Sequence, residues 1–282
     1  MKLGINLLCL TDFVEDDHLP RVEQLKSLGY DGVEVPVLKG EFAHYERLRK
    51  KLDEIGIDRS TTSIVPSPDI SPVSSDPEVR ARGRAHLDWA LDCAIALGAE
   101  SMGGPFHAPI GWFTGVGPTE DELTYGAEAH RALAERAAAN GIYLCLEPLN
   151  RFETYFLNTA EQSRAYVDRV GHPAFKIMYD TFHANIEERD PPAAIAQIGK
   201  DIGVFHVSEN DRGIPGRGQI NFAAMFGALK RTGYDGWLTL EAFGAGLPAI
   251  AAATRVWRPL FPDFDTLFAE SARFIRETWA TA

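Results

Sequence analysis

Short apolar runs alternate with longer amphipathic stretches along the whole chain. Each apolar run is short enough for one buried strand, and each amphipathic stretch has apolar residues at helical spacing. Four of the helical stretches stop at a glycine, namely Gly29, Gly56, Gly98 and Gly141. Glycine commonly closes a helix, and here each one precedes an apolar run. The pattern therefore predicts repeated strand–helix units and a parallel sheet.

Eight strands can be assigned from this pattern. They are 3–10, 32–37, 60–65, 101–105, 142–147, 175–180, 203–207 and 237–241. The expected helices are 19–28, 43–55, 78–97, 119–140, 159–170, 191–198, 222–230, 247–256 and 264–279. Thr119 is expected to cap the fourth helix in a capping box with Glu122. No linker interrupts the series, so we predict an α/β fold: a single (β/α)8 TIM barrel domain over residues 1–282.

Composition and charge narrow the function. An apolar content of 45% and a charged content of 24% are ordinary for a globular enzyme. The net charge of −12 repels phosphate backbones, so we expect no nucleic-acid partner. No apolar run approaches the ~20 residues of a membrane span, and acidic residues follow the first strand where a signal peptide would have a cleavage site. The three cysteines are widely spaced, which predicts reduced thiols and a cytoplasmic protein.

Metal-capable residues stand where four consecutive strands end. Catalytic groups of a TIM barrel gather at the carboxyl ends of its strands. Here the last four strands reach Glu147, Asp180, His206 and Glu241, at separations of 33, 26 and 35 residues. Each separation is close to one strand–helix unit, so the four side chains should surround one point above the barrel. Because the chain has neither GxGxxG after its first strand nor GxxxxGK[ST], nucleotide-binding α/β folds are disfavoured.

Three crowded carboxylates would repel one another and raise one another's pKa unless a cation lay between them. The alternative is a solvated or salt-bridged cluster, which needs compensating basic residues; Arg151 and Arg217 are the nearest candidates. Three carboxylates and one imidazole suit a fairly hard divalent ion, Mn²⁺, Co²⁺ or Mg²⁺, better than a structural Zn²⁺. We therefore predict one divalent cation, with open positions for substrate oxygens.

Four segments, 146–153, 180–185, 206–213 and 216–218, resemble the xylose-isomerase-like sugar isomerases. Within that family they are most similar to ketose 3-epimerases of the D-tagatose/D-allulose 3-epimerase type. The resemblance implies a metal-dependent isomerase in which Glu147, Asp180, His206 and Glu241 hold an Mn²⁺-type ion. It also implies that Glu147 and Glu241 flank C3 of a bound ketose. One removes the C3 proton and the other returns a proton to the opposite face of a cis-enediolate.

The same resemblance implies further binding residues. Glu153, His183 and Arg217 would hold the O1–O3 end of the sugar. His107 and Trp112, in the loop after the fourth strand, are further candidates for the pocket. Each has an ordinary structural alternative: a surface charge, a core histidine, a solvated loop arginine or a packing aromatic. A homo-oligomer, either a dimer or a tetramer, is also expected.

The chemistry agrees with two carboxylates and a cation. A proton next to a ketone is far too weakly acidic for a free carboxylate, so the developing enediolate needs a cation on its oxygens. Carboxylates on opposite faces then allow the proton to be removed and returned without moving the sugar. The first strand departs from the family, because it is aliphatic apart from Asn6 where many members are aromatic. The identity of the sugar therefore stays open.

Four other functions remain possible from the sequence. An aldose–ketose or hydroxypyruvate-type isomerase would use the same ion and a similar enediolate. An inosose-type dehydratase would instead eliminate water. A DNA-repair endonuclease would need several zinc ions and more histidines, and the single strand-terminal histidine and the negative charge argue against it. A non-catalytic binding protein would not need two acid–base carboxylates.

Overall fold

The computed structural model describes residues 1–282 and contains one closed barrel of eight parallel strands in chain order. The strands are β1 (Lys2–Asn6), β2 (Gly32–Pro36), β3 (Asp58–Thr62), β4 (Ser101–Gly104), β5 (Tyr143–Leu146), β6 (Phe175–Asp180), β7 (Ile202–Val207) and β8 (Trp237–Leu240). β1 pairs with β8, which closes the sheet. The predicted (β/α)8 TIM barrel is confirmed.

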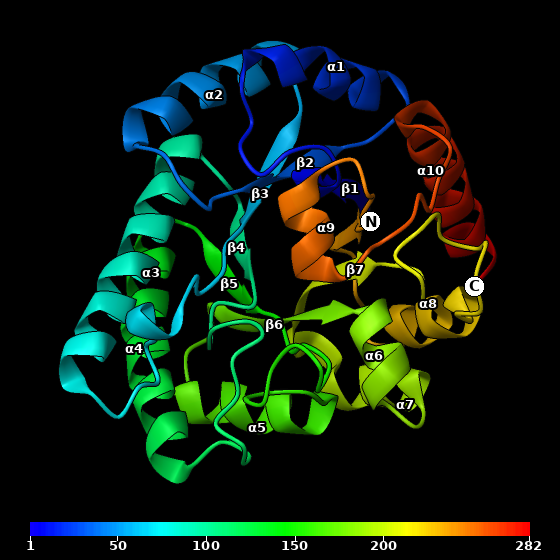
Figure 1. Ribbon diagram of the computed structural model, residues 1–282. Helices are drawn as coiled ribbons and strands as arrows, with labels where there is room; N and C mark the ends of the chain where they lie inside the picture. Colours follow the sequence, from blue (N-terminus) through cyan, green and yellow to red (C-terminus); the bar gives the residue numbers. More distant parts are fainter.

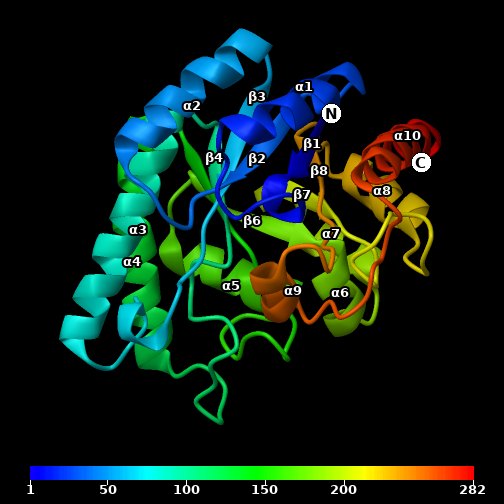
Figure 2. The same cartoon turned by 45° about the horizontal axis from the view of Figure 1, so that its top comes forward.

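Ten α-helices accompany the strands. They are α1 (Leu19–Ser27), α2 (Phe42–Ile55), α3 (Pro77–Leu97), α4 (Glu120–Ala139), α5 (Ala160–Val170), α6 (Thr181–Glu187), α7 (Pro191–Ile198), α8 (Phe222–Arg231), α9 (Pro248–Thr254) and α10 (Phe264–Thr281). Most of them form a ring around the barrel, whereas α9 lies inside this ring, in front of the strands (Figure 1). In the turned view of Figure 2, α9 appears between α5 and α6. No helix combines the length and apolar character needed to cross a membrane.

Two local expectations were wrong. The apolar run 3–10 is not one strand, because β1 ends at Asn6 and a 3₁₀ turn follows over Leu7–Cys9. The Asn6 side chain accepts a hydrogen bond from the backbone N–H of Leu8 at 2.9 Å and so turns the chain. The helix α6 was not predicted at all. It starts directly after β6, so strand and helix share a boundary with no connecting loop.

The sequence signals at the ends of three helices and at the cysteines predicted the observed structure correctly. The hydroxyl of Thr119 accepts from the backbone N–H of Glu122 at 3.2 Å, and the Glu122 carboxylate accepts from the backbone N–H of Thr119 at 2.7 Å. This is the predicted capping box at the start of α4. Gly56 and Gly98 close α2 and α3 in the left-handed region, with φ of 73° and 69°. The three cysteines are buried and unpaired, as expected.

The barrel interior is filled below the site by Cys145, Met178, Val204 and Trp237, which form a small core of their own. Side chains alternate between the two faces of a strand. The residues two positions after Cys145, Met178 and Val204 therefore also point into the barrel, one layer nearer the carboxyl ends of the strands. This alternation places the metal-capable residues above a packed floor.

Glycine at position 32 is required by this floor. A Cβ at Gly32 would collide with the ring of Trp237 and would lie 2.9 Å from the backbone oxygen of Asp58. By contrast, a Cβ at Gly227, inside α8, would contact only the side chain of Arg231, at 3.5 Å.

We expect Gly32→Ala to lower the free energy of unfolding by about 1–3 kcal/mol, because it overpacks the barrel interior. Gly227→Ala should raise the same quantity by about 0.5–1 kcal/mol, because alanine restricts the unfolded chain and suits a helix. Urea unfolding followed by circular dichroism checks both signs. A Gly32→Ala protein as stable as the wild type would mean that Trp237 shifts without cost.

Candidate active site

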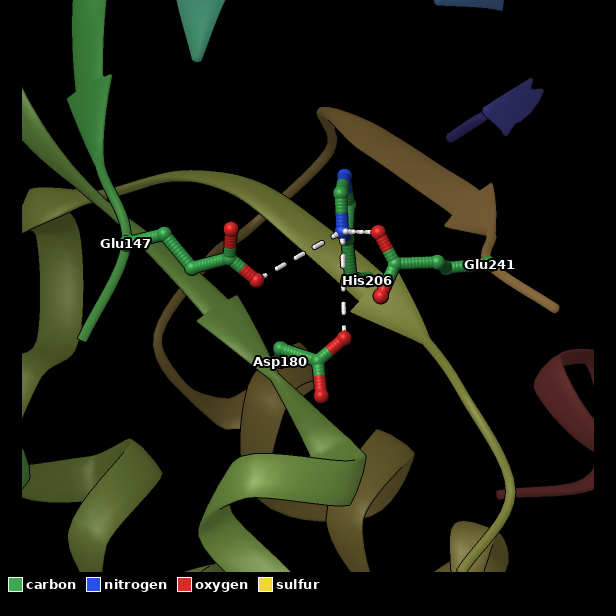
Figure 3. A group of neighbouring side chains, drawn as sticks. All are labelled: Glu147, Asp180, His206 and Glu241. Carbon is green, nitrogen blue, oxygen red and sulfur yellow. Dashed lines mark ion pairs between the residues drawn. The ribbon is translucent and has the colours of Figure 1, made fainter. Parts of the chain in front are cut away.

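Four side chains from consecutive strand ends meet at one point. Asp180 and His206 lie in β6 and β7, whereas Glu147 and Glu241 directly follow β5 and β8. One ligand atom from each lies within 4.8 Å of the others. From Nδ1 of His206 the distances are 3.3 Å to Glu241, 3.8 Å to Asp180 and 4.0 Å to Glu147. Glu147 and Glu241 extend toward each other from opposite sides, with Asp180 and His206 between them (Figure 3).

This geometry suits a divalent cation. Oxygen or nitrogen ligands at ~2.1 Å from one ion lie roughly 3 to 4 Å from one another, and the three distances from Nδ1 of His206 to the carboxylates fall in this range. All four side chains are buried. Moreover, Oδ2 of Asp180 and Nδ1 of His206 are buried polar atoms with no hydrogen-bond partner in the chain. Buried polar atoms without a hydrogen-bond partner are rare in folded proteins, so these two need a physical explanation. The cluster can therefore hold a divalent metal.

The two carboxylate oxygens of Asp180 have different roles: one caps a helix, and the other faces the cluster. Its Oδ1 accepts from the backbone N–H groups of Phe182 and His183, at 2.7 and 3.0 Å, and so caps α6. This capping fixes the carboxylate, and its unpartnered Oδ2 then faces the cluster. The abrupt change from β6 to α6 is thus the local device that orients this ligand.

The imidazole of His206 is oriented from behind. Its Nε2 lies 3.1 Å from Oε1 of Glu34, and both side chains are almost fully buried. A carboxylate can only accept, so the N–H at Nε2 faces Glu34. Nδ1 then faces the three carboxylates, where it can hold either a cation or a second proton. Such a carboxylate behind a metal-binding histidine is a common supporting contact, yet nothing in the spacing of Glu34, at the centre of β2, pointed to it.

Glu241 is held by two donors. The amide of Asn6 donates to Oε1 at 3.0 Å, and the guanidinium of Arg212 donates to Oε2 at 2.5 Å. Arg212 also lies 3.5 Å from Oδ2 of Asp180 and stacks on the ring of Phe182 at 3.7 Å. Asn6, at the end of β1, therefore contacts the site directly.

The pKa shifts of the four metal-capable side chains indicate that negative charge exceeds positive charge in this cluster. Burial, reinforced by Glu241, raises the pKa of Glu147 well above its usual value. Burial also raises the pKa of Asp180, to about 7, although Arg212 opposes it. Burial disfavours ionised Glu241, but Arg212 and His206 outweigh it and lower its pKa. Burial would lower the pKa of His206, but Glu34 and Glu241 raise it well above its usual value. One more cation would allow every carboxylate to ionise.

Arg217, which the family resemblance implies as a sugar-binding residue, is placed apart from the cluster. Arg217 does not line the pocket; about half of its side chain is exposed, and it forms an ion pair with Glu270 at 2.7 Å. Its flanking glycines shape the loop instead. Gly216 donates its N–H to Glu209 at 2.8 Å, and a Cβ at Gly218 would collide with the same carboxylate. The glycines thus serve close packing within the chain.

Arg212 is the arginine of the site, five residues before the one predicted. It is buried, although its backbone has a left-handed φ of 67° that non-glycine residues rarely adopt. The sequence pointed to Arg151 and Arg217 as the nearest compensating charges, whereas the structure places Arg212 beside Asp180 and Glu241. It stands in the same segment as His206, so position after the seventh strand was the signal that could have identified it.

His183 lies beside this arginine. Its Nδ1 accepts from the backbone N–H of Asn150 at 3.1 Å, which leaves the ring hydrogen on Nε2. Nε2 is 3.0 Å from Nη2 of Arg212 and 3.8 Å from Oε1 of Glu147. Burial and Arg212 lower the pKa of His183 well below its usual value, so the ring is neutral. With the ring hydrogen on Nε2, His183 and Arg212 present two donors 3.0 Å apart at the pocket, and these converging donors can bind one substrate oxygen.

Glu153 also lines the pocket, and its carboxylate accepts from the side-chain amide of Asn150 at 2.8 Å. The other two predicted binding residues do not line it. His107 is fully buried, stacks on Phe156 and donates from Nε2 to the backbone oxygen of Glu147 at 3.0 Å. Burial lowers the pKa of His107 to about 3, so it is a neutral support for the Glu147 backbone. Trp112 is partly exposed in the outer loop and packs on Tyr155.

A pocket of about 130 Å³ opens over the cluster. Its charged and acid–base lining residues are Glu147, Glu153, His183, Arg212 and Glu241, and most of its other lining residues are apolar. The pocket thus joins two carboxylates of the cluster to the pair of converging donors.

The profile of a protein family described as "Xylose isomerase-like TIM barrel" matches residues 22–278 of the chain. The chain belongs to this family. Among its relatives, L-ribulose 3-epimerase of Methylomonas sp. (strain DH-1) is 32% identical over 253 residues, which is 89% of this chain and 88% of the relative. D-psicose 3-epimerase of Agrobacterium fabrum (strain C58 / ATCC 33970) is 35% identical over 246 residues, or 86% and 84% of the two chains.

A solved structure of an L-ribulose 3-epimerase superposes with a TM-score of 0.93 at 32% identity, covering 100% of this chain and 95% of that one. The relatives named here are therefore sugar 3-epimerases that match nearly the whole chain. This member of the family is an enzyme of the isomerase class.

Proposed function

We propose that the chain is a metal-dependent ketose 3-epimerase. The observation that carries this proposal is the pair Glu147 and Glu241, which face each other across the cluster from β5 and β8 and line the same pocket. An epimerase must remove a proton from one face of a carbon and deliver one to the other face. Two opposed carboxylates can do both without turning the substrate.

In the proposed reaction the C3–H bond of the ketose breaks, and its proton passes to one of the two glutamates. The electron pair left on C3 forms a C2=C3 double bond, and the carbonyl oxygen at C2 takes the negative charge of a cis-enediolate. The other glutamate, which starts the cycle protonated, then delivers its proton to the opposite face of C3, the ketone re-forms, and the two glutamates have exchanged protonation states. Glu147 and Glu241 exchange roles when the reaction runs in reverse.

The converging donors of His183 and Arg212 are proposed to hold an oxygen at the O1–O3 end of the ketose, with Glu153 accepting from a hydroxyl there. Preorganised donors next to a developing oxyanion lower the barrier, because no reorganisation is needed during the reaction. Arg212 replaces Arg217 in this role. His107 is proposed to position the Glu147 backbone rather than contact the sugar.

We propose Mn²⁺ as the ion held by Glu147, Asp180, His206 and Glu241, with Co²⁺ and Mg²⁺ as substitutes. Three carboxylate oxygens and one imidazole support a fairly hard divalent cation. When bound, the cation would act as a Lewis acid that stabilises negative charge on the substrate oxygens. The cytoplasmic location and the dimer or tetramer expected from the sequence stay predictions.

Exchange with deuterated water tests the reaction. Free ketopentoses and ketohexoses are incubated with the enzyme and Mn²⁺, and the products are separated from their C3 epimers. Deuterium at C3 together with the C3 epimer supports the proposal. Deuterium at C1 would instead show aldose–ketose or hydroxypyruvate-type isomerisation, and a product lighter by one water would show a dehydratase.

Arginine variants separate the two candidate residues. Arg212→Met should lower kcat/KM by roughly a hundredfold or more, because it removes one of the converging donors and leaves Glu241 without its ion pair. Arg217→Met, a matched change at the exposed ion pair with Glu270, should alter kcat/KM by less than about threefold. Melting curves of both proteins identify any loss from unfolding. A greater effect at Arg217 than at Arg212 would contradict this assignment.

A further inference from the structure

The pocket has two chemically distinct ends. Its charged and acid–base residues lie together, since short distances link Glu147 to His183, His183 to Arg212 and Arg212 to Glu241. The remaining lining is mostly aliphatic and includes Leu8, Leu38, Ile64 and Ile110, with the ring of Phe243 and the hydroxyl-bearing Thr62 and Thr254 among them. A ketose with C3 between the two glutamates and O1–O3 at the charged end must extend its C4–C6 tail toward this aliphatic end.

The helix α9 completes the aliphatic end from a distant part of the chain. Ile250, Ala253 and Thr254 of this helix lie late in the chain. They line the same pocket as Leu8 and Ile64, which lie early in the chain. In Figure 1, α9 lies in front of the strands, inside the ring of helices. The hydroxyl of Thr254 donates to the backbone oxygen of Ile250 at 2.8 Å, so its hydrogen is already used within the helix.

We propose that the preferred substrate is an unphosphorylated ketose whose far end is a methyl group, that is, a 6-deoxyketohexose. This inference rests on the proposed 3-epimerase function and adds the substrate class. The only side-chain hydroxyls among the aliphatic residues of this end belong to Thr62 and Thr254. A terminal hydroxymethyl group placed there would lose water and find few partners, whereas a methyl group loses nothing.

A terminal phosphate fits this end even less well. Phosphate recognition in proteins uses arginine, lysine or clustered backbone N–H groups. Arg212 is the only basic side chain that lines the pocket apart from His183, and it already contacts Glu241 and Asp180. The two glutamates of the cluster and Glu153 would also repel a dianion.

Matched substrate pairs test the proposal with the metal-loaded enzyme. D-fructose is compared with 6-deoxy-D-fructose, D-tagatose with 6-deoxy-D-tagatose, and L-sorbose with 6-deoxy-L-sorbose; D-fructose 6-phosphate is the phosphorylated probe. The two sugars of a pair differ only at C6. We expect kcat/KM for the deoxy sugar of the best pair to be about tenfold higher, the lower end of what an apolar pocket achieves for one hydroxyl group. D-fructose 6-phosphate should show no turnover.

Variants of the aliphatic wall give a second, independent readout. Ile64→Asn places an amide at the end of the pocket and should reduce the deoxy preference to about unity or reverse it. Ile64→Val keeps the wall aliphatic and should keep the preference. Ile250→Asn, on α9, makes the same change from a different element, so the test does not depend on one variant folding well. The ratio of two kcat/KM values within one variant is insensitive to the fraction of active protein.

The outcomes separate this inference from the proposed function. Deuterium incorporation at C3 with a deoxy preference that Ile64→Asn or Ile250→Asn removes supports both. Incorporation at C3 with equal or faster turnover of the hydroxylated partner in every pair overturns the substrate class alone. Turnover of the phosphorylated probe overturns it as well. No incorporation at C3 with any sugar overturns the epimerase function and this inference with it.

Discussion

Glu147→Gln and Glu241→Gln are each expected to lower kcat for epimerisation by about 10³-fold or more. Glutamine keeps the shape of the side chain but cannot take up the C3 proton, and acid–base groups commonly contribute 10²–10⁴-fold. The carboxamide is also a weaker ligand than a carboxylate, which adds to the loss. Glu270→Gln, at the exposed ion pair with Arg217, is the matched control and should leave kcat within about twofold.

The two variants should also differ in which epimer exchanges its C3 hydrogen, because the two bases lie on opposite faces of C3. Each variant retains one glutamate, which can remove and return a proton on its own face of C3. Glu147→Gln should therefore exchange the C3 hydrogen of one epimer with deuterated water without inverting it, and Glu241→Gln should exchange the other epimer. Nuclear magnetic resonance of the recovered sugars measures this. Exchange of the same epimer by both variants would contradict the arrangement of one base on each face.

The positions of Glu147, Asp180, His206 and Glu241 could be expected from the sequence because two regularities combine. Consecutive parallel strands end on the same side of a barrel, and side chains alternate between its interior and exterior. Metal-capable residues at four consecutive strand ends must therefore lie close to one another at the same end of the barrel. The structure brings these four side chains together, and the same regularities explain why the eight strands were identified with small errors at their ends.

Arg212 and Glu34 could not be assigned in this way. Arg212 lies in an irregular loop where no periodicity relates sequence position to direction, and its left-handed backbone is uncommon for arginine. Glu34 lies inside β2 and appears in sequence as one charged residue of an otherwise apolar strand. Its contact with His206 depends on packing across the barrel between residues 172 positions apart. The family resemblance implied Arg217, but the glycines on either side of it are explained by close contact with Glu209 and Phe274.

Removal of divalent metal should abolish activity, with a loss of at least about a hundredfold after dialysis against a chelator, and Mn²⁺ or Co²⁺ should restore it. The physical reason is the excess of carboxylates, since the ion would stabilise both the substrate oxyanion and the ionised ligands. Full activity in metal-free protein would exclude the proposed mechanism.

A second readout does not depend on turnover. An ion that binds only the folded protein raises its melting temperature with concentration, because binding stabilises the folded state by mass action. Mn²⁺ should therefore raise the melting temperature of metal-free wild type by several degrees. Asp180→Asn should lose most of this shift, since Oδ2 of Asp180 is one of the unpartnered atoms that face the cluster. Glu270→Gln should keep the whole shift. An equal shift in wild type and Asp180→Asn would place the binding ion elsewhere, and the buried carboxylates would then need a different counter-charge.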